Sequence, residues 1–429
     1  MSTSGIHFEN ERCLLVERPD EIPLWHSDSY GSEGFYSWVT RRFRITSQRD
    51  ACLRARFGQR EWLLFPKEQD CQERDEIVVA PGGDELRLSH PWMGGDVTVA
   101  LPKASAPGGL PSWLSEREDD AYRCDLSDLG FGGDRRVATR LGNFLLLQSE
   151  TQPDWRAVGR LREWVLNNPI EAVYWKRHDR SVQQKGKAAL SPVRLWGHEE
   201  AAGTILESGV RYEIDFSEGY SFGLFLDQRE NRHRLLKNQV TAGVSLLPPA
   251  GPDRPVVLNS FAYTCGFSVC AALAGAKVVS VDLSRKYLAW GKRNFVANEL
   301  DPEDHEFLYG DVFGWVKRFA RRNRRFDLVI LDPPTFSRSK EWGVFKVERD
   351  LAKLMEWVVP LVNPGGWILV SSNAASWFPG DFMAQLRSAI SRGGRRLGRS
   401  QYATQPWDFG WVSGDEAYLK TCWFEIIGG

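Results

Sequence analysis

The stretch PVVLNSFAYTCGFSVCAALAGAKVVSVD, residues 255–282, decides the fold class of this chain. Its two ends are short runs rich in Val and Leu, which favour β-strands, and its middle is rich in Ala, which favours a helix. A strand, a helix and a second strand in this order form a βαβ unit, in which the two strands lie parallel. The stretch therefore predicts a parallel β-sheet.

The same alternation continues towards the end of the chain. It predicts strands at 255–261, 277–282, 305–309, 326–332 and 365–372, and helices at 268–276, 284–300, 311–322 and 347–362. Further elements are expected on either side, namely a hairpin of 211–216 with 221–226, a helix over 227–240 and an added strand within 416–427. Apolar strands separated by helices specify a mainly parallel sheet covered on both faces. We therefore expect an α/β fold, with a doubly wound Rossmann-like domain over 206–429.

Two smaller domains are expected before it. Residues 1–110 read as a β-rich domain, with strands at 13–17, 38–46, 61–65, 76–80 and 96–102 separated by turn signals. Residues 103–119 are rich in Pro, Gly and Ser and resemble a linker. Residues 120–205 are expected to form a small α/β domain, with strands at 143–148 and 172–176 and a helix at 155–168.

The composition is that of a soluble globular protein, with 429 residues, 42% of them hydrophobic and 26% charged. No apolar run approaches the ~20 residues that a membrane span needs, and the first residues have no apolar signal core. The seven cysteines are scattered without a CxxC pair, which argues against a zinc site and a disulfide scaffold. We expect a reduced cytoplasmic protein without a membrane or metal partner.

Charge is divided unevenly along the chain. Residues 1–120 hold 14 Lys+Arg and 21 Asp+Glu, and the remainder holds 41 and 35, so the two parts carry −7 and +6. A modest basic excess in the second part favours a polyanionic partner such as RNA. Three basic tracts could contact RNA: Tyr174, Trp175, Lys176, Arg177, Arg180, Lys185 and Lys187; Arg338 and Lys340; and Lys317, Arg318, Arg321, Arg322, Arg324 and Arg325. The last tract ends a helix, where the helix dipole alone also favours cations.

Carboxylates follow three of the predicted strands. Asp282 ends the second strand, Asp311 follows the third, and Asp332-Pro333-Pro334 follows the fourth. Ligands of open α/β sheets bind beyond the carboxyl ends of the strands, where one acid suits ribose hydroxyls and another an adenine amino group. A helix cap is the alternative role for Asp282 and Asp311. The motif GxGxxG is absent, so the set predicts a site for an adenosine-containing ligand other than a dinucleotide.

Four segments resemble the class I rRNA large-subunit methyltransferases: SFGLFLDQREN (221–231), LNSFAYTCGFSVCAALAGAKVVSVDLSRKYLAWGKRNF (258–295), LDPPTFSRSK (331–340) and GGWILVSSN (365–373). The chain is most similar to the guanine-N7 half of the bacterial bifunctional 23S enzyme, and next to the cytosine-C5 enzymes of the same superfamily. The resemblance extends upstream through 140–148 and 174–187 and covers 120–429. Residues 1–110 resemble no RNA-binding module of those families.

The resemblance implies S-adenosylmethionine as the cofactor and RNA, 23S rRNA or a ribosome precursor, as the partner. The loop 259–266 would wrap the methionine part, Asp282 would hold the ribose, and Asp311 would hold the adenine. The implied cofactor residues are Asp227, Arg229, Asn259, Phe261, Tyr263, Thr264, Gly266, Asp282, Leu283, Asp311, Val312 and Asp332. The implied transfer site consists of Asp332, Pro333, Pro334, Thr335 and Asn373.

The segment after the fifth strand bears on the target base. Cytosine-C5 enzymes need a thiolate nucleophile, which the related enzymes carry after this strand, whereas this chain has Ser371-Ser372-Asn373 there. Guanine N7 already carries a lone pair and needs only alignment with the methyl donor. We therefore expect methylation at guanine N7, with Phe336 able to stack on a flipped base. The alternatives are cytosine-C5 methylation, a non-catalytic scaffold in ribosome assembly, and a small-molecule or protein methyltransferase.

Overall fold

The computed structural model describes residues 6–9, 13–18, 53–57, 60–66, 78–82, 85–90 and 95–100, and residues 119–428 except 125, 127–130, 132–135, 154, 167, 178–191, 198–201, 219–220, 242–243, 250, 252, 340, 375–376, 378, 404 and 410–418. The strand expected at 38–46 lies outside the described residues, and so does the expected linker up to residue 118.

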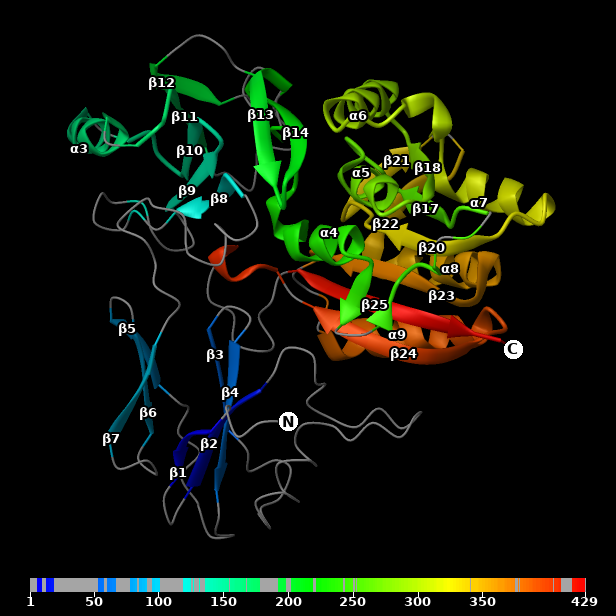
Figure 1. Ribbon diagram of the computed structural model, residues 1–429, viewed down its shortest axis with the longest axis horizontal. Helices are drawn as coiled ribbons and strands as arrows, with labels where there is room; N and C mark the ends of the chain where they lie inside the picture. Colours follow the sequence, from blue (N-terminus) through cyan, green and yellow to red (C-terminus); the bar gives the residue numbers. More distant parts are fainter. Residues whose placement is uncertain are drawn as a thin grey trace.

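A seven-stranded sheet with the order β19-β18-β17-β20-β23-β25-β24 forms the centre of the fold (Figure 1). Its strands are β17 (Val256–Ser260), β18 (Lys277–Asp282), β19 (Glu306–Tyr309), β20 (Phe326–Leu331), β23 (Val362–Ser372), β24 (Arg396–Ala403) and β25 (Lys420–Ile427). The first five in the sheet order pair in parallel, and β25 is antiparallel to both of its neighbours. The predicted parallel sheet and the added C-terminal strand are both confirmed.

Helices cover both faces of this sheet. One face packs against α4 (Arg229–Leu236), α5 (Gly266–Leu273) and α6 (Arg285–Ala297), and the other against α7 (Val312–Arg321), α8 (Val347–Val358) and α9 (Pro379–Arg392). Alternate residues of each strand enter the two cores, as Val257 and Ile330 do on the first face and Leu258 and Val329 on the second. Because both faces are buried, the strands read as nearly continuous apolar runs. The doubly wound α/β fold is therefore confirmed.

Upstream of this sheet lies a five-stranded sheet with the order β12-β11-β10-β9-β8 (Figure 1). Its elements are β8 (Ala121–Cys124), β9 (Arg136–Leu141), β10 (Phe144–Ser149), α3 (Trp155–Leu166), β11 (Ala172–Arg177) and β12 (Val193–Gly197). Helix α3 packs on one face through Leu161 and Val165. The other face joins the first core through Leu146 and Tyr174, so the two units share buried apolar contacts.

The hairpin of β13 (Ala202–Glu207) and β14 (Val210–Asp215) lies between the two sheets (Figure 1). Its turn uses Ser208 and Gly209, both with positive φ, as a tight two-residue hairpin turn requires. The hairpin crosses the boundary expected between residues 205 and 206. The expected pairing of 211–216 with 221–226 is wrong, because β14 pairs with β13 instead.

Residues 221–225 form no strand, and the short helix η7 (Leu226–Gln228) follows them. The reason lies at Gly223, whose φ of 122° suits glycine and whose missing Cβ leaves room for the ring of Trp290 on α6. The helix expected over 227–240 also ends early, at Leu236, because Asn238 turns the chain with a φ of 52°.

Several elements of the structure were not predicted. They are the hairpin β21 (Phe336–Ser339)–β22 (Gly343–Lys346), the pair β15 (Gln239–Thr241)–β16 (Val244–Ser245), helix α9 and strand β24, with the short helices η6 (Phe216–Glu218), η8 (Pro302–Asp304), η9 (Val359–Leu361) and η10 (Trp407–Phe409). The N-terminal strands form two antiparallel sheets. The first has the order β1 (Ile6–Glu9), β2 (Cys13–Arg18), β4 (Arg60–Pro66) and β3 (Leu53–Phe57). The second has the order β5 (Val78–Gly82), β6 (Glu85–His90) and β7 (Gly95–Ala100). The strands expected at 13–17, 61–65, 76–80 and 96–102 are therefore confirmed.

Candidate active site at the carboxyl ends of the strands

The loop after β17 has a strained backbone. Phe261, Tyr263 and Cys265 all have positive φ, at 59°, 50° and 63°, a region that residues other than glycine rarely occupy. Such a conformation persists only where the surroundings fix it, and it concentrates at binding and catalytic sites. The predicted cofactor loop is therefore a preformed turn at the carboxyl edge of the sheet.

Hydrogen bonds from neighbouring segments hold this loop. Thr264 donates its hydroxyl to the carbonyl of Gly223 at 2.5 Å, and Asn294 of α6 donates its amide to the carbonyl of Thr264 at 2.9 Å. Asn259, at the end of β17, is buried and donates to the hydroxyl of Ser268 at 2.8 Å. Thr264 and Asn259, both predicted as cofactor residues, thus shape the loop from inside.

Asp282 at the end of β18 ties two loops together. Its carboxylate accepts the backbone N–H of Tyr263 and that of Ser284, both at 2.8 Å. Burial raises the pKa of Asp282, although the backbone donors oppose this shift. The cap of α6 is Ser284, which accepts from the N–H of Tyr287. The carboxylate retains acceptor capacity for two ribose hydroxyls.

Asp311 is the N-cap of α7. One of its oxygens accepts from the N–H groups of Phe313 and Gly314, at 2.9 and 3.2 Å, so the alternative role as a helix cap is what the structure shows. Two exposed apolar side chains stand near it, Leu283 after β18 and Tyr309 at the end of β19. Exposed apolar groups at this edge suit the faces of an adenine ring.

Asp332 lies in a buried polar network at the end of β20. Its Oδ1 accepts from the hydroxyl of Ser371 at 2.7 Å and from the amide of Gln228 at 3.1 Å. Gln228 in turn accepts from Asn231, and Asn231 accepts from the indole of Trp423. Burial and the nearby charge of Asp227 raise the pKa of Asp332 to about 6, against the hydrogen bond from Ser371. A carboxyl group with a perturbed pKa at such an edge indicates a functional group.

The segment after Asp332 meets the segment after β23. Thr335 donates its hydroxyl to Oδ1 of Asn373 at 2.8 Å, and both side chains are exposed. Pro333 is buried and Pro334 is exposed between them. Phe336, at the start of β21, is 54% exposed. The structure therefore brings the five predicted transfer residues together at one edge.

The upstream helix places its predicted residues differently. The negative charge of Asp227 raises the pKa of Asp332. The guanidinium of Arg229, in contrast, is fully buried and binds Asp408 at 2.5 Å and the carbonyl of Ala121 at 3.2 Å. Arg229 thus holds the upstream sheet and η10 together. Val312 is buried in the core under α7.

Arg232, one helical turn later, was missed in the sequence. It is 3% exposed and forms a two-pronged ion pair with Glu207 through Nε and Nη2. Its charge lowers the pKa of Asp332, so it lies at the site. Arg229 and Arg232 look alike in the sequence, and only the pairing of β13 with β14 brings Glu207 to α4.

The cysteines nearest the site are poor nucleophiles. Cys265 and Cys270 are buried, and burial raises the pKa of each to about 12, whereas a reactive cysteine needs a lowered pKa. Ser372, at the position of the cysteine in the cytosine enzymes, is 1% exposed and accepts from the N–H of Ala374.

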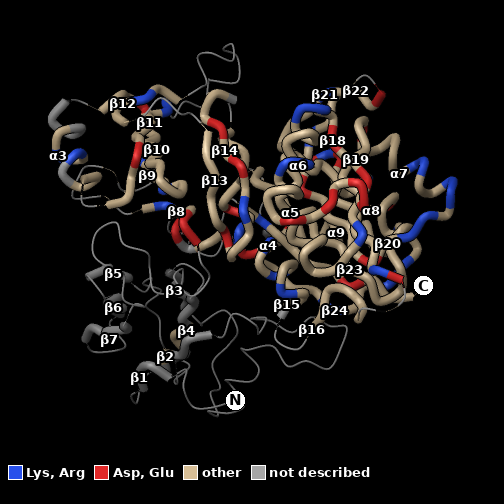
Figure 2. Tube along the Cα trace, turned by 45° about the horizontal axis from the view of Figure 1, so that its top comes forward, with Lys and Arg blue, Asp and Glu red and all other residues tan. Residues whose placement is uncertain are grey.

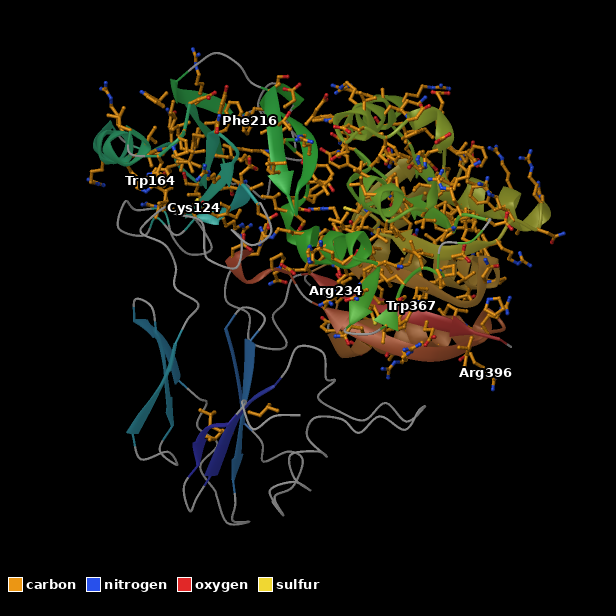
Figure 3. The ribbon with its side chains drawn as sticks, in the orientation of Figure 1. Cys124, Trp164, Phe216, Arg234, Trp367 and Arg396 are labelled. Atoms are coloured by element: carbon orange, nitrogen blue, oxygen red, sulfur yellow. The ribbon has the colours of Figure 1, made fainter. Side chains whose placement is uncertain are left out.

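The basic tracts are only partly at this edge. Tyr174 is buried and its ring stacks on Phe216, labelled in Figure 3, so the expectation that Tyr174 could contact RNA is wrong. Lys176 is half-buried, and burial lowers its pKa to about 8. Residues 178–191, which contain Arg180, Lys185 and Lys187, lie outside the described residues.

The tract from Lys317 to Arg325 lies at the opposite edge. Helix α7 begins near the end of β19 and finishes before β20 begins, so its last turn is at the amino end of β20. Figure 2 shows the Lys and Arg residues gathered there. Arg324 of this tract binds Glu306 through two nitrogens at 2.8 and 2.6 Å. Arg338, by contrast, is exposed on β21 beside the site.

Two further findings concern the described residues alone. No group of three or more His, Cys, Asp or Glu residues among them could hold a metal ion. No helix in the described part of the chain is both long and apolar enough to cross a membrane.

The residues at this edge fit S-adenosylmethionine. A Cβ at Gly266, where α5 begins, would come within 2.8 Å of Leu224, so glycine lets the backbone of this first turn pack closely against that side chain. The first turn of α5 has no side-chain cap, which leaves N–H groups for an anionic ligand. The carboxylate of Asp282 can accept hydrogen bonds from hydroxyl groups, and the exposed side chains of Leu283 and Tyr309 can contact an apolar ring.

The sheet order and this edge define a Rossmann-like α/β protein with a nucleoside-cofactor site. Residues 136–411 match the family described as S-adenosylmethionine-dependent methyltransferase. The chain belongs to this family, and its cofactor is S-adenosylmethionine.

Curated relatives and solved structures agree with this family. The putative ribosomal RNA large subunit methyltransferase YwbD of Bacillus subtilis is 34% identical over 219 residues, 50% of this chain and 52% of its own length. Ribosomal RNA large subunit methyltransferase K of Neisseria meningitidis serogroup B is 31% identical over 286 residues, 64% and 75%. The crystal structure of SMU.776, a putative methyltransferase complexed with SAH, is 27% identical with a TM-score of 0.55, covering 77% and 85%. The chain spans about half the length of the B. subtilis relative.

Proposed function

We propose that this protein is an S-adenosylmethionine-dependent RNA methyltransferase that forms 7-methylguanosine in 23S rRNA or in a ribosome precursor. The observation that carries the proposal is the meeting of Asp332, Thr335 and Asn373 beside the cofactor loop, with Ser372 where a cytosine-C5 enzyme needs a cysteine. The names of the relatives as large subunit rRNA methyltransferases support the substrate class.

The cofactor supplies an electrophilic methyl group on a sulfonium sulfur. The chain's own residues then have to align the acceptor nitrogen and exclude water, because guanine N7 needs no proton removed before it reacts. Partly buried Asp332 and buried Pro333 form the floor of such a transfer site, and no acid or base has to act.

Asn373 suits the recognition of guanine. Its Oδ1 accepts from Thr335, which leaves the Nδ2 group as a donor towards a base. Guanine presents the O6 acceptor next to N7, whereas adenine presents an amino donor there. The pair Thr335–Asn373 therefore favours guanine over adenine when N7 faces the methyl group.

The hairpin after Pro334 suits contact with single-stranded RNA. Phe336 offers an exposed ring on which a flipped base can stack, and Arg338 on the same strand offers a charge for a phosphate. We keep the division into 1–110, 120–205 and 206–429 as part of this proposal, with RNA contacts in the second domain. A cytoplasmic location belongs to it too, because ribosomes are assembled there in bacteria.

Mapping of modified nucleosides in rRNA tests the proposal. A strain that lacks the gene should lose one 7-methylguanosine, and the purified protein should restore it with S-adenosylmethionine. Loss of 5-methylcytidine, or an unchanged set of rRNA modifications, would contradict the assignment.

A second experiment separates the two base chemistries. Cytosine-C5 enzymes form a covalent bond to C6 of the base, so 5-fluorocytosine RNA traps them as adducts. This protein should form no adduct, and it should keep its activity in Cys265→Ala and Cys270→Ala variants. A stable, cysteine-dependent adduct would restore the cytosine alternative.

A further inference from the structure

Gln228, at the start of α4, is a buried glutamine whose side chain reaches the transfer site. Its amide nitrogen donates to Oδ1 of Asp332 at 3.1 Å and to the hydroxyl of Ser371 at 3.0 Å. Its amide oxygen accepts from the amide of Asn231 at 2.8 Å. A buried amide whose oxygen and nitrogen both have partners is held in one orientation. Gln228 therefore has a fixed position beside Asp332.

The direction of these hydrogen bonds is set away from the transfer site. The indole nitrogen of Trp423, which is fully buried on β25, can only donate, and it donates to Oδ1 of Asn231 at 3.0 Å. The amide nitrogen of Asn231 must then face the oxygen of Gln228. This contact turns the nitrogen of Gln228 towards Asp332. The chain Trp423–Asn231–Gln228 therefore ends in a donor to this carboxylate.

The two carboxylate oxygens of Asp332 have different surroundings. Oδ1 accepts from Gln228 at 3.1 Å and from Ser371 at 2.7 Å. Oδ2 accepts from no residue in the described part of the chain, and Asp332 is partly exposed. Because an ionised carboxylate accepts at both oxygens, Oδ2 keeps its capacity for a group of the substrate.

We propose that Gln228 is a positioning residue of the transfer site, which holds Oδ1 of Asp332 so that Oδ2 faces the base that receives the methyl group. The inference rests on the proposed function, methylation of guanine N7. In that reaction the bond between sulfur and the methyl carbon breaks as the bond between this carbon and N7 forms, and no proton moves. The positive charge of the sulfonium passes to the guanine ring. An ionised carboxylate held beside the ring stabilises this charge as it develops.

The donors also affect the ionisation of Asp332. Burial has the largest effect on the pKa of Asp332 and raises it, the charge of Asp227 on η7 raises it further, and the charge of Arg232 on α4 lowers it. The hydrogen bonds from Gln228 and Ser371 lower the pKa too, because they favour the charged form. Gln228 therefore helps to keep the carboxylate ionised at neutral pH as well as to place it.

The first experiment measures the pKa of Asp332 in wild type and in Gln228→Met, which keeps the length of the side chain and removes its donors. NMR of isotope-labelled carboxyl carbons follows the titration, and the signal that Asp332→Asn lacks assigns the residue. Gln228→Met should raise the pKa of Asp332 above the wild-type value of about 6. This measurement needs no RNA. An unchanged pKa in Gln228→Met overturns the proposal.

The second experiment measures methylation of 23S rRNA by the same proteins. In Gln228→Met, kcat should fall about 10-fold, as for the loss of one hydrogen bond to a charged group, with an unchanged KM for S-adenosylmethionine. The rise of kcat with pH should move to higher pH together with the pKa of Asp332, because the ionised carboxylate is the active form. A higher KM at unchanged kcat would place Gln228 in the cofactor site and overturns the proposal.

Trp423→Phe tests whether the indole sets the direction of the chain, and it decides the matter if Gln228→Met does not fold. It should raise the pKa of Asp332 and lower kcat about 5-fold, as for one neutral hydrogen bond. Trp290→Phe is the matched control and should change neither, because the buried indole of Trp290 has no acceptor among the described residues. Equal effects of the two variants overturn the proposal. Wild-type protein that forms no 7-methylguanosine would refute the proposed function, whereas the pKa values would still test the position of Gln228.

Discussion

Strand β20 carries an aspartate at each of its ends, and the two carboxylates have opposite surroundings. Asp327, near the start, accepts from the N–H of Val256 and from the amide of Asn363, both at 2.8 Å. Asp332, after the last residue, is partly buried near the charge of Asp227, and desolvation and this charge raise its pKa to about 6. The first carboxylate joins neighbouring strands, whereas the second holds a charge at a cost in stability.

The rest of the sheet repeats this difference. At the amino edge, Arg324 pairs with Glu306 and lowers the pKa of that carboxyl group, and His305 accepts from the N–H of Val278. At the carboxyl edge, Asp282 and Asp332 both have raised pKa values, because burial outweighs their hydrogen bonds. Glu306 and His305 at the amino edge therefore stabilise the fold, whereas the raised pKa values of Asp282 and Asp332 at the carboxyl edge are typical of a functional site.

The largest effect is expected at Asp282. If Asp282 binds the ribose as we propose, Asp282→Ala removes two charge-assisted hydrogen bonds, each worth about 1.5–3 kcal/mol. The substitution also frees the N–H groups of Tyr263 and Ser284. Binding of SAH should fall at least ~100-fold in calorimetric titration. The matched variant at the amino edge, Asp327→Ala, should lower the urea midpoint and leave the affinity for SAH unchanged. Equal affinity in Asp282→Ala and wild type would remove this carboxylate from the cofactor site.

Replacing each aspartate of β20 by asparagine should have effects of opposite sign. The raised pKa of Asp332 means that the folded protein binds more protons than the unfolded chain between pH 4 and 6, so stability falls as pH rises through this window. Asp332→Asn should therefore be more stable than wild type at pH 7.5, by about 1–3 kcal/mol, with no difference below pH 4. Asp327→Asn replaces an acceptor of two hydrogen bonds and should be less stable at pH 7.5.

Urea titrations at pH 4, 5 and 7.5 measure both variants. Turnover of Asp332→Asn should nevertheless fall at least ~10-fold, because a change in the network also moves the transfer site. A variant that is destabilised at every pH would show that the hydrogen bonds from Ser371 and Gln228 outweigh the cost of burial.

The sequence was sufficient to predict the sheet and its carboxyl edge, for a physical reason. Strands buried on both faces must be continuously apolar, and the polar residues that interrupt them, such as Asp282 and Asp332, then mark the strand ends. The positions after parallel strands meet at one edge, so the residues of the transfer site could be grouped without coordinates. The roles of these transfer-site residues came from the resemblance to the rRNA methyltransferases, and they stay predictions because the contacts in the structure do not test them.

The contacts of α4 could not be predicted in the same way. Arg229, Arg232 and Gln228 are polar, and a polar helix suggests solvent exposure, yet all three are buried. Their partners Glu207, Asp408 and Asp332 come from segments far apart in the chain. Local patterns also failed at 221–226, where alternating residues suggested a strand and Gly223 instead turns the chain beside Trp290.

A smaller effect is expected from the hydrogen bond between Thr335 and Asn373. Thr335→Val keeps the shape and removes the donor to Oδ1 of Asn373, which frees the amide to rotate. Turnover should fall about 5-fold, as for the loss of one neutral hydrogen bond of ~1 kcal/mol, with unchanged SAH affinity. Thr204→Val, an exposed threonine on β13, is the matched control and should leave turnover unchanged. A loss of SAH affinity in Thr335→Val would instead assign the pair to the cofactor.

The smallest effect distinguishes the charges of the two edges. Arg338 stands on β21 beside the site, and Arg322 stands at the far end of α7, and both are exposed. If single-stranded RNA crosses the carboxyl edge, each phosphate neutralised by the protein adds about 0.7 to the log–log slope of affinity against salt concentration. Arg338→Glu should therefore flatten the slope by about that amount, whereas Arg322→Glu should leave it unchanged. Fluorescence anisotropy of labelled RNA between 50 and 200 mM salt, about the range in which such contacts are resolved, measures both. Equal slopes for the two variants would show that the RNA does not follow the carboxyl edge, and a flatter slope for Arg322→Glu alone would move the RNA surface to α7.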